Sequence, residues 1–228
     1  HDGNRGEAVL WASQIGAATE HLGAYQGHGN VAHPHGILIT WATITEGGVQ
    51  VNAAGERFWN EAQGYSEAAR AVLSQAQGEA YAIFDGRISE IAEQFEDFKR
   101  AKSEGAIKSA ETLEELAEDL GLPADTLCKT IADISPNRTD RFGRTFGETV
   151  LSPPFCGVRV TGALFHTQGG LKVDTSARVI CKNGSIISNL YAGGGAACGV
   201  SGSGDSGYLS GNGLLAAVVL GRIAGKAS

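Results

Sequence analysis

Apolar and polar positions follow two different periods along the chain, and together they predict a mixture of helices and short strands. Helical spacing of apolar residues predicts helices over 2–22, with Asp2 as N-cap, and over 66–77, 88–102, 124–134 and 214–224. Apolar runs predict strands over 37–44, 49–52, 81–85, 157–160, 171–174, 179–181 and 186–192. Residues 25–36 show neither period and are expected to be irregular. The expected fold class is therefore α+β.

Capping and turn residues mark the limits of some of these elements. Thr112-Leu-Glu-Glu115 has the form of a capping box, and Gly121 is expected to end the helix that it opens. Pro123 suits the first turn of the next helix. Residues 136–144 are polar and rich in turn formers, which predicts a linker at this point.

Composition narrows the class of protein. A chain of 228 residues with 42% hydrophobic and 19% charged residues can bury a full core, as one large domain or two small ones. The net charge of -7 does not suggest a protein that binds nucleic acid, and no apolar stretch is long enough to span a membrane. The four scattered cysteines indicate neither a zinc site nor a disulfide framework, so a cytoplasmic location is expected. Because the chain has no methionine, we expect His1 to follow a cleavage or to mark the edge of a larger polypeptide.

Glycine is concentrated in a run over 189–213 that precedes the last predicted helix. Glycine permits positive φ and leaves no Cβ between the backbone and a ligand. A helix that begins near Asn212 would direct unpaired N–H groups and partial positive charge at the occupant of the loop. The run therefore predicts a site for an anionic or electron-rich group. The alternative is a surface loop before a C-terminal helix.

Histidine gathers at one place, where His28, His33 and His35 lie within eight residues. No cysteine or carboxylate is close by, so a substrate cleft or an ordinary loop explains them better than a metal site, and no metal is expected. Further on, Arg57-Phe-Trp-Asn-Glu61 surrounds two aromatic residues with polar ones. We expect Arg57 and Glu61 to form a buried structural pair.

Several motifs occur together in a characteristic order. They are Asp2-Gly3, Gly55-Glu-Arg-Phe-Trp-Asn-Glu61, Phe165-His-Thr-Gln-Gly-Gly-Leu171, Asn189-Leu-Tyr-Ala-Gly-Gly194, Gly211-Asn-Gly-Leu-Leu215 and Leu220-Gly-Arg-Ile-Ala-Gly225. In this order they resemble the C-terminal portion of the fumarate reductase/succinate dehydrogenase flavoprotein family, which includes the 3-ketosteroid dehydrogenases. The resemblance extends over nearly the whole chain.

This resemblance implies the C-terminal part of a two-domain flavoprotein, in which a mixed α/β capping domain interrupts an FAD-binding domain. Residues 1–36 and 149–228 would belong to the FAD domain and residues 37–148 to the capping (substrate) domain. The family's N-terminal G-x-G-x-x-G unit, which holds the ADP half of FAD, has no counterpart in this sequence. On its own the chain is therefore expected to hold FAD weakly or not at all.

The resemblance also assigns cofactor contacts. The start of the last helix would lie against the flavin, where a helix N-terminus stabilises the negative charge of the reduced ring. The residues implied to bind FAD are Gly193, Gly194, Gly195, Ser210, Asn212, Gly213, Leu214 and Leu215. Gly195 departs from the family, which commonly has glutamate there.

Two tyrosines distinguish this chain from the fumarate reductases. Those enzymes resemble it elsewhere but carry arginines, which clamp carboxylates, where this chain has Tyr65 and Tyr208. A phenol can donate to a ketone oxygen or, once deprotonated, act as a general base. The resemblance therefore implies Tyr65, Tyr208 and His166 as catalytic residues, with His28, Thr167 and Gly211 as substrate-binding residues. The alternatives are packed tyrosines, and a His166 that only hydrogen-bonds a loop.

The expected function is that of an FAD-dependent oxidoreductase. It would transfer hydride between flavin and a carbon–carbon bond beside a carbonyl of a small, largely apolar, ketosteroid-like molecule. One alternative is a dicarboxylate reductase of the fumarate/succinate type. Another is a non-catalytic module that cannot hold FAD and self-associates through an exposed apolar surface. No nucleic acid or membrane is expected as a partner.

Overall fold

The computed structural model describes residues 3–204 and 207–227, so Asp2, the expected N-cap of the first helix, lies outside the described residues. The chain divides into two compact units. Unit 1 comprises residues 1–26 and 164–228, and unit 2 comprises residues 27–163. The unit boundaries lie at 26/27 and 163/164, whereas the domain boundaries expected from the sequence lie at 36/37 and 148/149. The assignment of an FAD domain and a capping domain to these segments stays a prediction.

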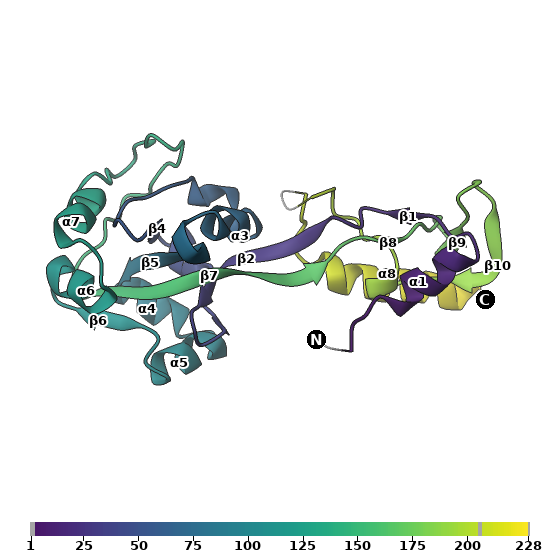
Figure 1. Ribbon diagram of the computed structural model, residues 1–228, viewed down its shortest axis with the longest axis horizontal. Helices are drawn as coiled ribbons and strands as arrows, with labels where there is room; N and C mark the ends of the chain where they lie inside the picture. Colours follow the sequence, from purple (N-terminus) through teal and green to yellow (C-terminus); the bar gives the residue numbers. More distant parts are fainter. Residues whose placement is uncertain (1–2, 205–206, 228) are drawn as a thin grey trace. The chain divides into compact units, whose positions relative to one another are not determined.

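Unit 2 is built on an antiparallel sheet with helices against it (Figure 1). Its strands are β2 (Tyr25–Ala32), β3 (Ile37–Leu38), β4 (Val49–Val51), β5 (Glu79–Asp85), β6 (Lys108–Ala110) and β7 (Phe155–Thr167), where β2 begins and β7 ends in unit 1. The sheet order is β3-β2-β7-β5-β4, and β6 pairs with β7. The register of β5 and β7 runs from Glu79 opposite Thr161 to Asp85 opposite Phe155.

The helices of unit 2 are mostly short. They are α2 (Ala42–Thr45), α3 (Tyr65–Leu73), α4 (Gly86–Ala92), α5 (Glu96–Ser103), α6 (Leu113–Leu120) and α7 (Ala124–Ala132), with two 3-10 turns, η1 (Glu61–Gln63) and η2 (Ala76–Gly78). The predicted capping box is confirmed, because Thr112 Oγ1 accepts from Glu115 N and Glu115 Oε2 accepts from Thr112 N. Gly121 ends α6 in the left-handed region, as predicted.

The sheet of unit 2 is covered on both faces. Successive side chains of a strand point to opposite faces, so β5 supplies Phe84 to one buried cluster and Ile83 to another. Phe84 packs in the cluster that holds Ile88 of α4 and Phe98 of α5. Ile83 packs in the cluster formed with α6 and α7. This double cover explains why residues 80–84 of β5 form a continuous apolar run.

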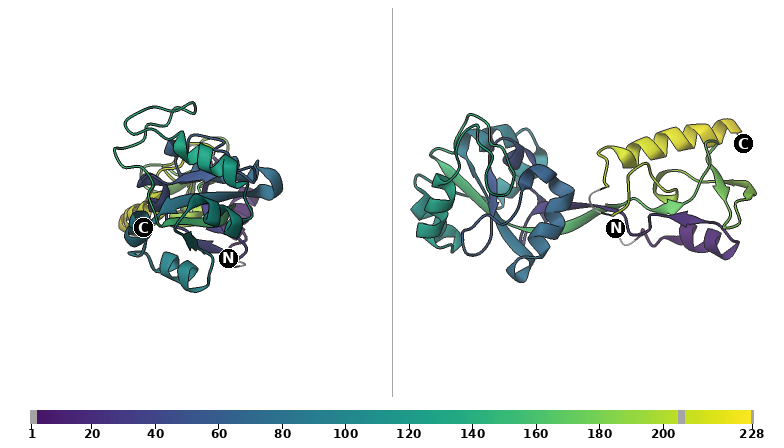
Figure 2. Two further views of the ribbon diagram at one scale, coloured as in Figure 1. Left: turned by 90° about the vertical axis from the view of Figure 1, so that its left-hand side faces the viewer. Right: turned by 90° about the horizontal axis from the view of Figure 1, so that it is seen from above.

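Unit 1 consists of short strands between two helices, α1 (Glu7–Gln14) and α8 (Asn212–Ala227), which Figure 2 shows on opposite sides. The strands are β1 (Thr19–Glu20), β8 (Gly170–Leu171), β9 (Arg178–Ile180) and β10 (Ile186–Tyr191), followed by the 3-10 turn η3 (Gly194–Ala196). β1 pairs antiparallel with β8, and β9 with β10. A small core of mainly alanine side chains surrounds Leu171 and Val179.

The structure corrects several sequence-based elements. The first helix is only eight residues long, and residues 42–45 are helical where the apolar run predicts a strand. The single helix predicted over 88–102 is two helices, which leaves Phe95 at their junction 48% exposed.

The segment predicted as irregular contains strand β2. Its glycines permit a close approach to α3, because a Cβ on Gly29 would lie 2.3 Å from the carbonyl carbon of Ala68. The predicted linker over 136–144 is also wrong, since this segment supplies side chains to the buried interior of unit 2.

Candidate functional site

An aromatic cluster surrounds His28 in unit 2. The His28 imidazole stacks on the Tyr65 ring, with 5.1 Å between centroids and 17° between planes. Trp41 meets both rings edge-on, at 5.8 Å from His28 and 6.4 Å from Tyr65. Trp59 lies against Trp41, with 6.4 Å between centroids. The middle of β2, the turn before α2, the segment before η1 and the first residue of α3 thus contribute to one aromatic cluster, which we call the aromatic wall.

His28 is held in one uncharged form. Its Nδ1 accepts a hydrogen bond from the backbone N–H of Asn30 at 3.2 Å, so in the neutral imidazole the proton belongs on Nε2. Burial lowers the pKa of His28 to about 4. At neutral pH the side chain is therefore a neutral imidazole whose Nε2 is a donor.

A buried polar network supports this wall from behind. The amide of Gln50 donates to the carbonyl of Gly29 at 2.8 Å and accepts from Trp59 Nε1 at 3.0 Å. Asn30 donates to Ile39 O at 3.2 Å and to Thr43 Oγ1 at 3.1 Å. Every one of these bonds is buried, so the wall is fixed in position by groups that would be costly to leave unpaired.

The expected Arg57–Glu61 pair is present and belongs to a larger ionic cluster. Glu61 accepts from Arg57 Nε at 3.0 Å and lies 3.2 Å from Arg144 Nη1. Arg57 also donates to Asp140, and Arg144 donates to Gly48 O at 2.9 Å and Ile44 O at 2.8 Å. Two buried guanidinium groups are therefore matched by two carboxylates and by backbone carbonyls.

The pKa directions in this cluster follow from burial and pairing. Burial disfavours the charged form of Arg57, but its bonds to Glu61 and Asp140 outweigh this and raise the pKa of Arg57. Burial likewise opposes ionisation of Asp140, yet Arg57 holds the pKa of that carboxyl below its usual range. Burial lowers the pKa of Arg144 despite Glu61. These arginines are engaged within the protein, which favours a structural role.

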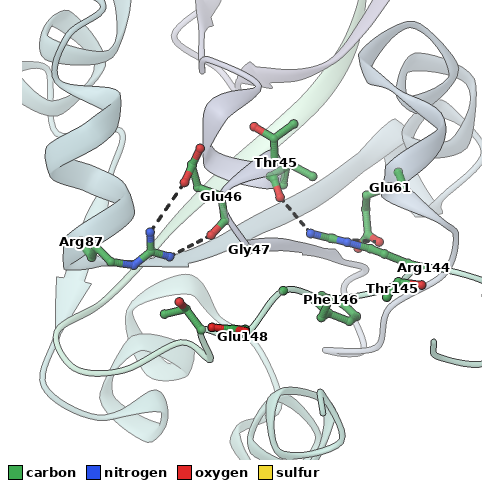
Figure 3. A pocket seen from close by; sticks show the side chains of 13 residues that line it. Thr45, Glu46, Gly47, Glu61, Arg87, Arg144, Thr145, Phe146 and Glu148 are labelled. Carbon is green, nitrogen blue, oxygen red and sulfur yellow. Dashed lines mark hydrogen bonds and ion pairs between the residues drawn. The ribbon is translucent and has the colours of Figure 1, made fainter. Parts of the chain in front are cut away.

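A cavity of about 450 Å³ lies beside this cluster (Figure 3). Arg87 and Glu46 face each other on its wall, where Arg87 Nη2 donates to the Glu46 carbonyl at 2.8 Å. Glu61, Arg144 and residues 145–149 complete much of the lining. None of the site residues predicted from the sequence lines this cavity.

In unit 1 the glycine-rich run packs on α8. A Cβ on Gly193 would lie 3.2 Å from Leu220 Cβ, and one on Gly194 would lie 3.5 Å from Ala217 Cβ. A Cβ added to Gly195 or Gly211, by contrast, would have no neighbouring atom within 4 Å. Gly193 and Gly194 therefore have a packing reason to be glycine, whereas Gly195 and Gly211 border open space.

A chain of side-chain amides connects the start of α8 to His166. Asn212 Oδ1 accepts from Val200 N at 2.8 Å, and Asn212 Nδ2 donates to Gln168 Oε1. Gln168 Nε2 lies 2.9 Å from His166 Nδ1. Asn212 and Gln168 are 2% and 3% exposed, while His166 is only partly buried. His166 also borders Gly213, where a Cβ would lie 3.2 Å from His166 Nε2.

The predicted site residues are thus distributed over both units. Tyr65 and His28 meet in unit 2. His166, Asn212 and Gly213 meet in unit 1, which also holds the half-buried Tyr208. Of the other predicted residues in unit 1, Gly193 and Gly194 are half-buried, and the rest are exposed, namely Thr167, Gly195, Ser210, Gly211, Leu214 and Leu215. Each unit is described by itself, so joint action of Tyr65 with Tyr208 or His166 stays a prediction.

Sequence reasoning misses Trp41, Gln168 and Asp140. The motif around Gln168 is visible in the sequence, but nothing in it distinguishes a buried amide bonded to histidine from an exposed loop residue. The other two lie far along the chain from residues that they contact. The remaining histidines of the predicted cluster separate, because His33 pairs with Glu79 at 3.1 Å and His35 is exposed.

Two further findings concern the described part of the chain alone. Within residues 3–204 and 207–227, no three His, Cys, Asp or Glu side chains gather in a way that could hold a metal ion. In the same ranges, no helix has both the length and the apolar composition needed to cross a membrane.

Comparison with known proteins places the chain in a family. The FAD binding domain family matches residues 2–214. A probable fumarate reductase of Shewanella frigidimarina is 31% identical over 225 residues, which cover 96% of this chain and 37% of the relative. A 3-oxosteroid 1-dehydrogenase of Mycobacterium tuberculosis is 29% identical over 234 residues, which cover 84% of this chain and 40% of the relative. The solved open conformation of a flavocytochrome c3 fumarate reductase gives a TM-score of 0.72 at 28% identity, covering 96% of this chain and 39% of that one.

The chain therefore belongs to the FAD-binding flavoprotein family that includes fumarate reductases and 3-oxosteroid 1-dehydrogenases. This confirms the resemblance inferred from the motifs and their order. The mixed helix and sheet structure agrees with the predicted α+β class and matches part of a flavoprotein fumarate reductase. The chain spans about two-fifths of the length of these relatives, at 37%, 40% and 39%.

Proposed function

We propose that this chain is the substrate- and flavin-facing part of an oxidoreductase that transfers hydride between FAD and a carbon–carbon bond beside a carbonyl. The observation that carries the proposal is the uncharged wall of unit 2, where neutral His28 stacks on Tyr65 beside Trp41. A wall of neutral donors and aromatic faces suits a flat, largely apolar ketone. It does not suit a dianion, which needs cationic partners.

The charges of unit 2 support the same choice. A dicarboxylate is recognised best by guanidinium groups that form bidentate pairs with it. The buried Arg57 and Arg144 are already paired with Glu61, and Arg57 also with Asp140. Tyr65 occupies the place where arginine is expected in fumarate reductases. Neither of these two arginines is therefore available to a dicarboxylate.

FAD, when bound, would supply the hydride acceptor or donor, and unit 1 has features that fit it. Gly195 and Gly211 leave their surroundings open, so a planar group can approach the backbone there. The 16-residue helix α8 begins beside Gly211 and places partial positive charge at this end. We propose Gly195, Gly211 and Gly213 as the closest backbone contacts, with exposed Leu214 and Leu215 against the ring.

Within this proposal the chain's own residues have separate tasks. Tyr65 and His28 bind and orient the carbonyl oxygen by hydrogen bonds, and Trp41 covers the apolar body of the substrate and excludes water. In unit 1, His166 is proposed as a hydrogen-bond donor and Tyr208 as the group that exchanges the proton accompanying hydride transfer. Thr167 would add a polar contact at the rim.

A ligand titration tests this choice of substrate class. Tryptophan fluorescence of the chain is followed while 4-androstene-3,17-dione or fumarate is added, because Trp41 and Trp59 belong to the proposed wall. We expect the ketone to quench and fumarate to have no effect. Tyr65→Phe keeps the stacked ring but removes the hydroxyl, and should weaken ketone binding about tenfold, the value of one lost hydrogen bond. Stronger binding of fumarate, or no effect in Tyr65→Phe, would refute the proposal.

A second candidate function, self-association, is favoured by the apolar surface of α8. Leu214, Leu215, Val218 and Val219 are 79%, 52%, 69% and 43% exposed. Such apolar exposure is typical of an association site. A visible spectrum of the purified chain together with sedimentation velocity separates the candidates. Flavin bands support the first, whereas a colourless oligomer that Val218→Glu dissociates supports the second.

A further inference from the structure

The hydrogen-bond chain that ends at His166 begins at a backbone N–H group, which is always a donor. The backbone N–H of Val200 can only donate, so the Asn212 side-chain atom 2.8 Å away must be the oxygen. The other end of that amide, Nδ2, then donates, and the Gln168 atom that it contacts must be the acceptor Oε1. The orientation of both amides is therefore fixed by the network.

The orientation of the Gln168 amide in turn determines which ring nitrogen of His166 carries the proton. With its oxygen turned to Asn212, Gln168 presents its NH₂ group to His166 Nδ1 at 2.9 Å. That nitrogen must accept, because two donors cannot face each other in a hydrogen bond. An imidazole that accepts at Nδ1 carries its proton on Nε2. The structure thus assigns His166 a single neutral tautomer.

Burial makes this assignment rigid. Gln168 and Asn212 are almost completely buried, so water cannot take the place of either amide. Reversing Gln168 would face its NH₂ group to the NH₂ group of Asn212, which leaves buried donors unpaired. Gly199 lies directly over Asn212, since a Cβ at position 199 would lie 2.5 Å from Nδ2.

We infer that Gln168 and Asn212 are positioning residues that fix His166 as an Nε2–H donor at the start of α8. In the proposed reaction this N–H donates to an oxygen atom of a bound ketone, and His166 does not accept a proton at Nδ1. The last step rests on the proposed function, whereas the tautomer does not. His28 in unit 2 is likewise protonated on Nε2, because the backbone N–H of Asn30 donates to its Nδ1.

Nitrogen-15 NMR of the labelled chain tests the tautomer without any cofactor. His166→Gln identifies the His166 signals by their disappearance. In the unmodified chain, the unprotonated ring-nitrogen signal should belong to Nδ1 and the protonated one to Nε2. Gln168→Glu keeps the shape but replaces the donor by a carboxylate oxygen, so Nδ1 should become protonated. Leu164→Val, a change at an exposed residue of the same strand, should leave the pattern unaltered.

A protonated Nδ1 in the unmodified chain, or an unchanged pattern in Gln168→Glu, would overturn the inference. A ketone titration of the same proteins tests the donor role. Gln168→Glu should weaken binding of 4-androstene-3,17-dione at least about tenfold, while Leu164→Val binds as before. If the tautomer changes as expected but no protein binds the ketone, the role of Gln168 in fixing the His166 tautomer is confirmed and the proposed substrate is wrong.

Discussion

Acidification should destabilise unit 2 through His28, a residue that is 6% exposed and whose imidazole stacks on Tyr65. Burial lowers its pKa from 6.5 to about 4 in the folded protein. The unfolded chain therefore binds a proton at higher pH than the folded one, and between these values protonation favours unfolding. The contribution of His28 is intact above pH 6.5 and is lost as the pH falls towards 4.

The magnitude follows from the two pKa values. One pKa unit corresponds to 1.36 kcal/mol, so a pKa of about 4 in place of 6.5 means that the free energy of unfolding falls by roughly 3 kcal/mol between pH 7 and pH 4. The slope should approach about 1.4 kcal/mol per pH unit in the middle of this range. A loss of this size is a large part of the stability of a typical domain.

Urea unfolding followed by circular dichroism, repeated from pH 7 to pH 4, gives the slope. Because carboxylates also titrate in this range, the relevant quantity is the difference between the unmodified chain and His28→Asn, which keeps an acceptor for the Asn30 N–H. His35→Asn is the matched control, since His35 is exposed. Only His28→Asn should differ from the unmodified chain in the slope of the unfolding free energy against pH. Parallel stability curves for His28→Asn and the unmodified chain would refute the argument.

Two further substitutions test the packing of unit 2. Glu61→Ala removes the carboxylate shared by Arg57 and Arg144 and should cost about 3–5 kcal/mol of unfolding free energy. Glu56→Ala, at an exposed neighbour, should change the unfolding free energy by less than about 0.5 kcal/mol. Equal losses in the two variants would contradict the buried ionic cluster. Gly29→Ala places a Cβ 2.3 Å from the α3 backbone and should cost about 3 kcal/mol or prevent folding. Gly221→Ala is the control, because this position on α8 borders open space, and it should gain roughly 0.5–1 kcal/mol of unfolding free energy. A stable Gly29→Ala protein would show that β2 and α3 are not in close contact.

Features that depend on neighbouring residues are predicted well from the sequence. The capping box at Thr112 and the end of α6 at Gly121 are local hydrogen-bond patterns and occur as expected. Strand β5 is found because an apolar run bounded by glycine is typical of a strand covered on both faces. The flavoprotein family follows from motif order, which carries more information than any one motif.

Other features depend on contacts that a single sequence does not display. Gly29 lies in a segment predicted to be irregular, because a glycine in a loop and a glycine under a helix look the same in sequence. Residues 136–144 have the composition of a linker, yet Asp140 reaches Arg57 over a separation of 83 residues. Gln168 gives no sign in the sequence that it is buried. The missed residues share this dependence on distant partners.

The central claim is that this flavoprotein segment serves a neutral carbonyl substrate. The most direct measurement mixes the FAD-loaded protein anaerobically with a saturated 3-ketosteroid or with succinate and follows flavin absorbance. We expect that the ketosteroid bleaches the flavin and succinate does not, and that Tyr65→Phe slows the bleaching. Bleaching by succinate, with the ketosteroid inert, would contradict it.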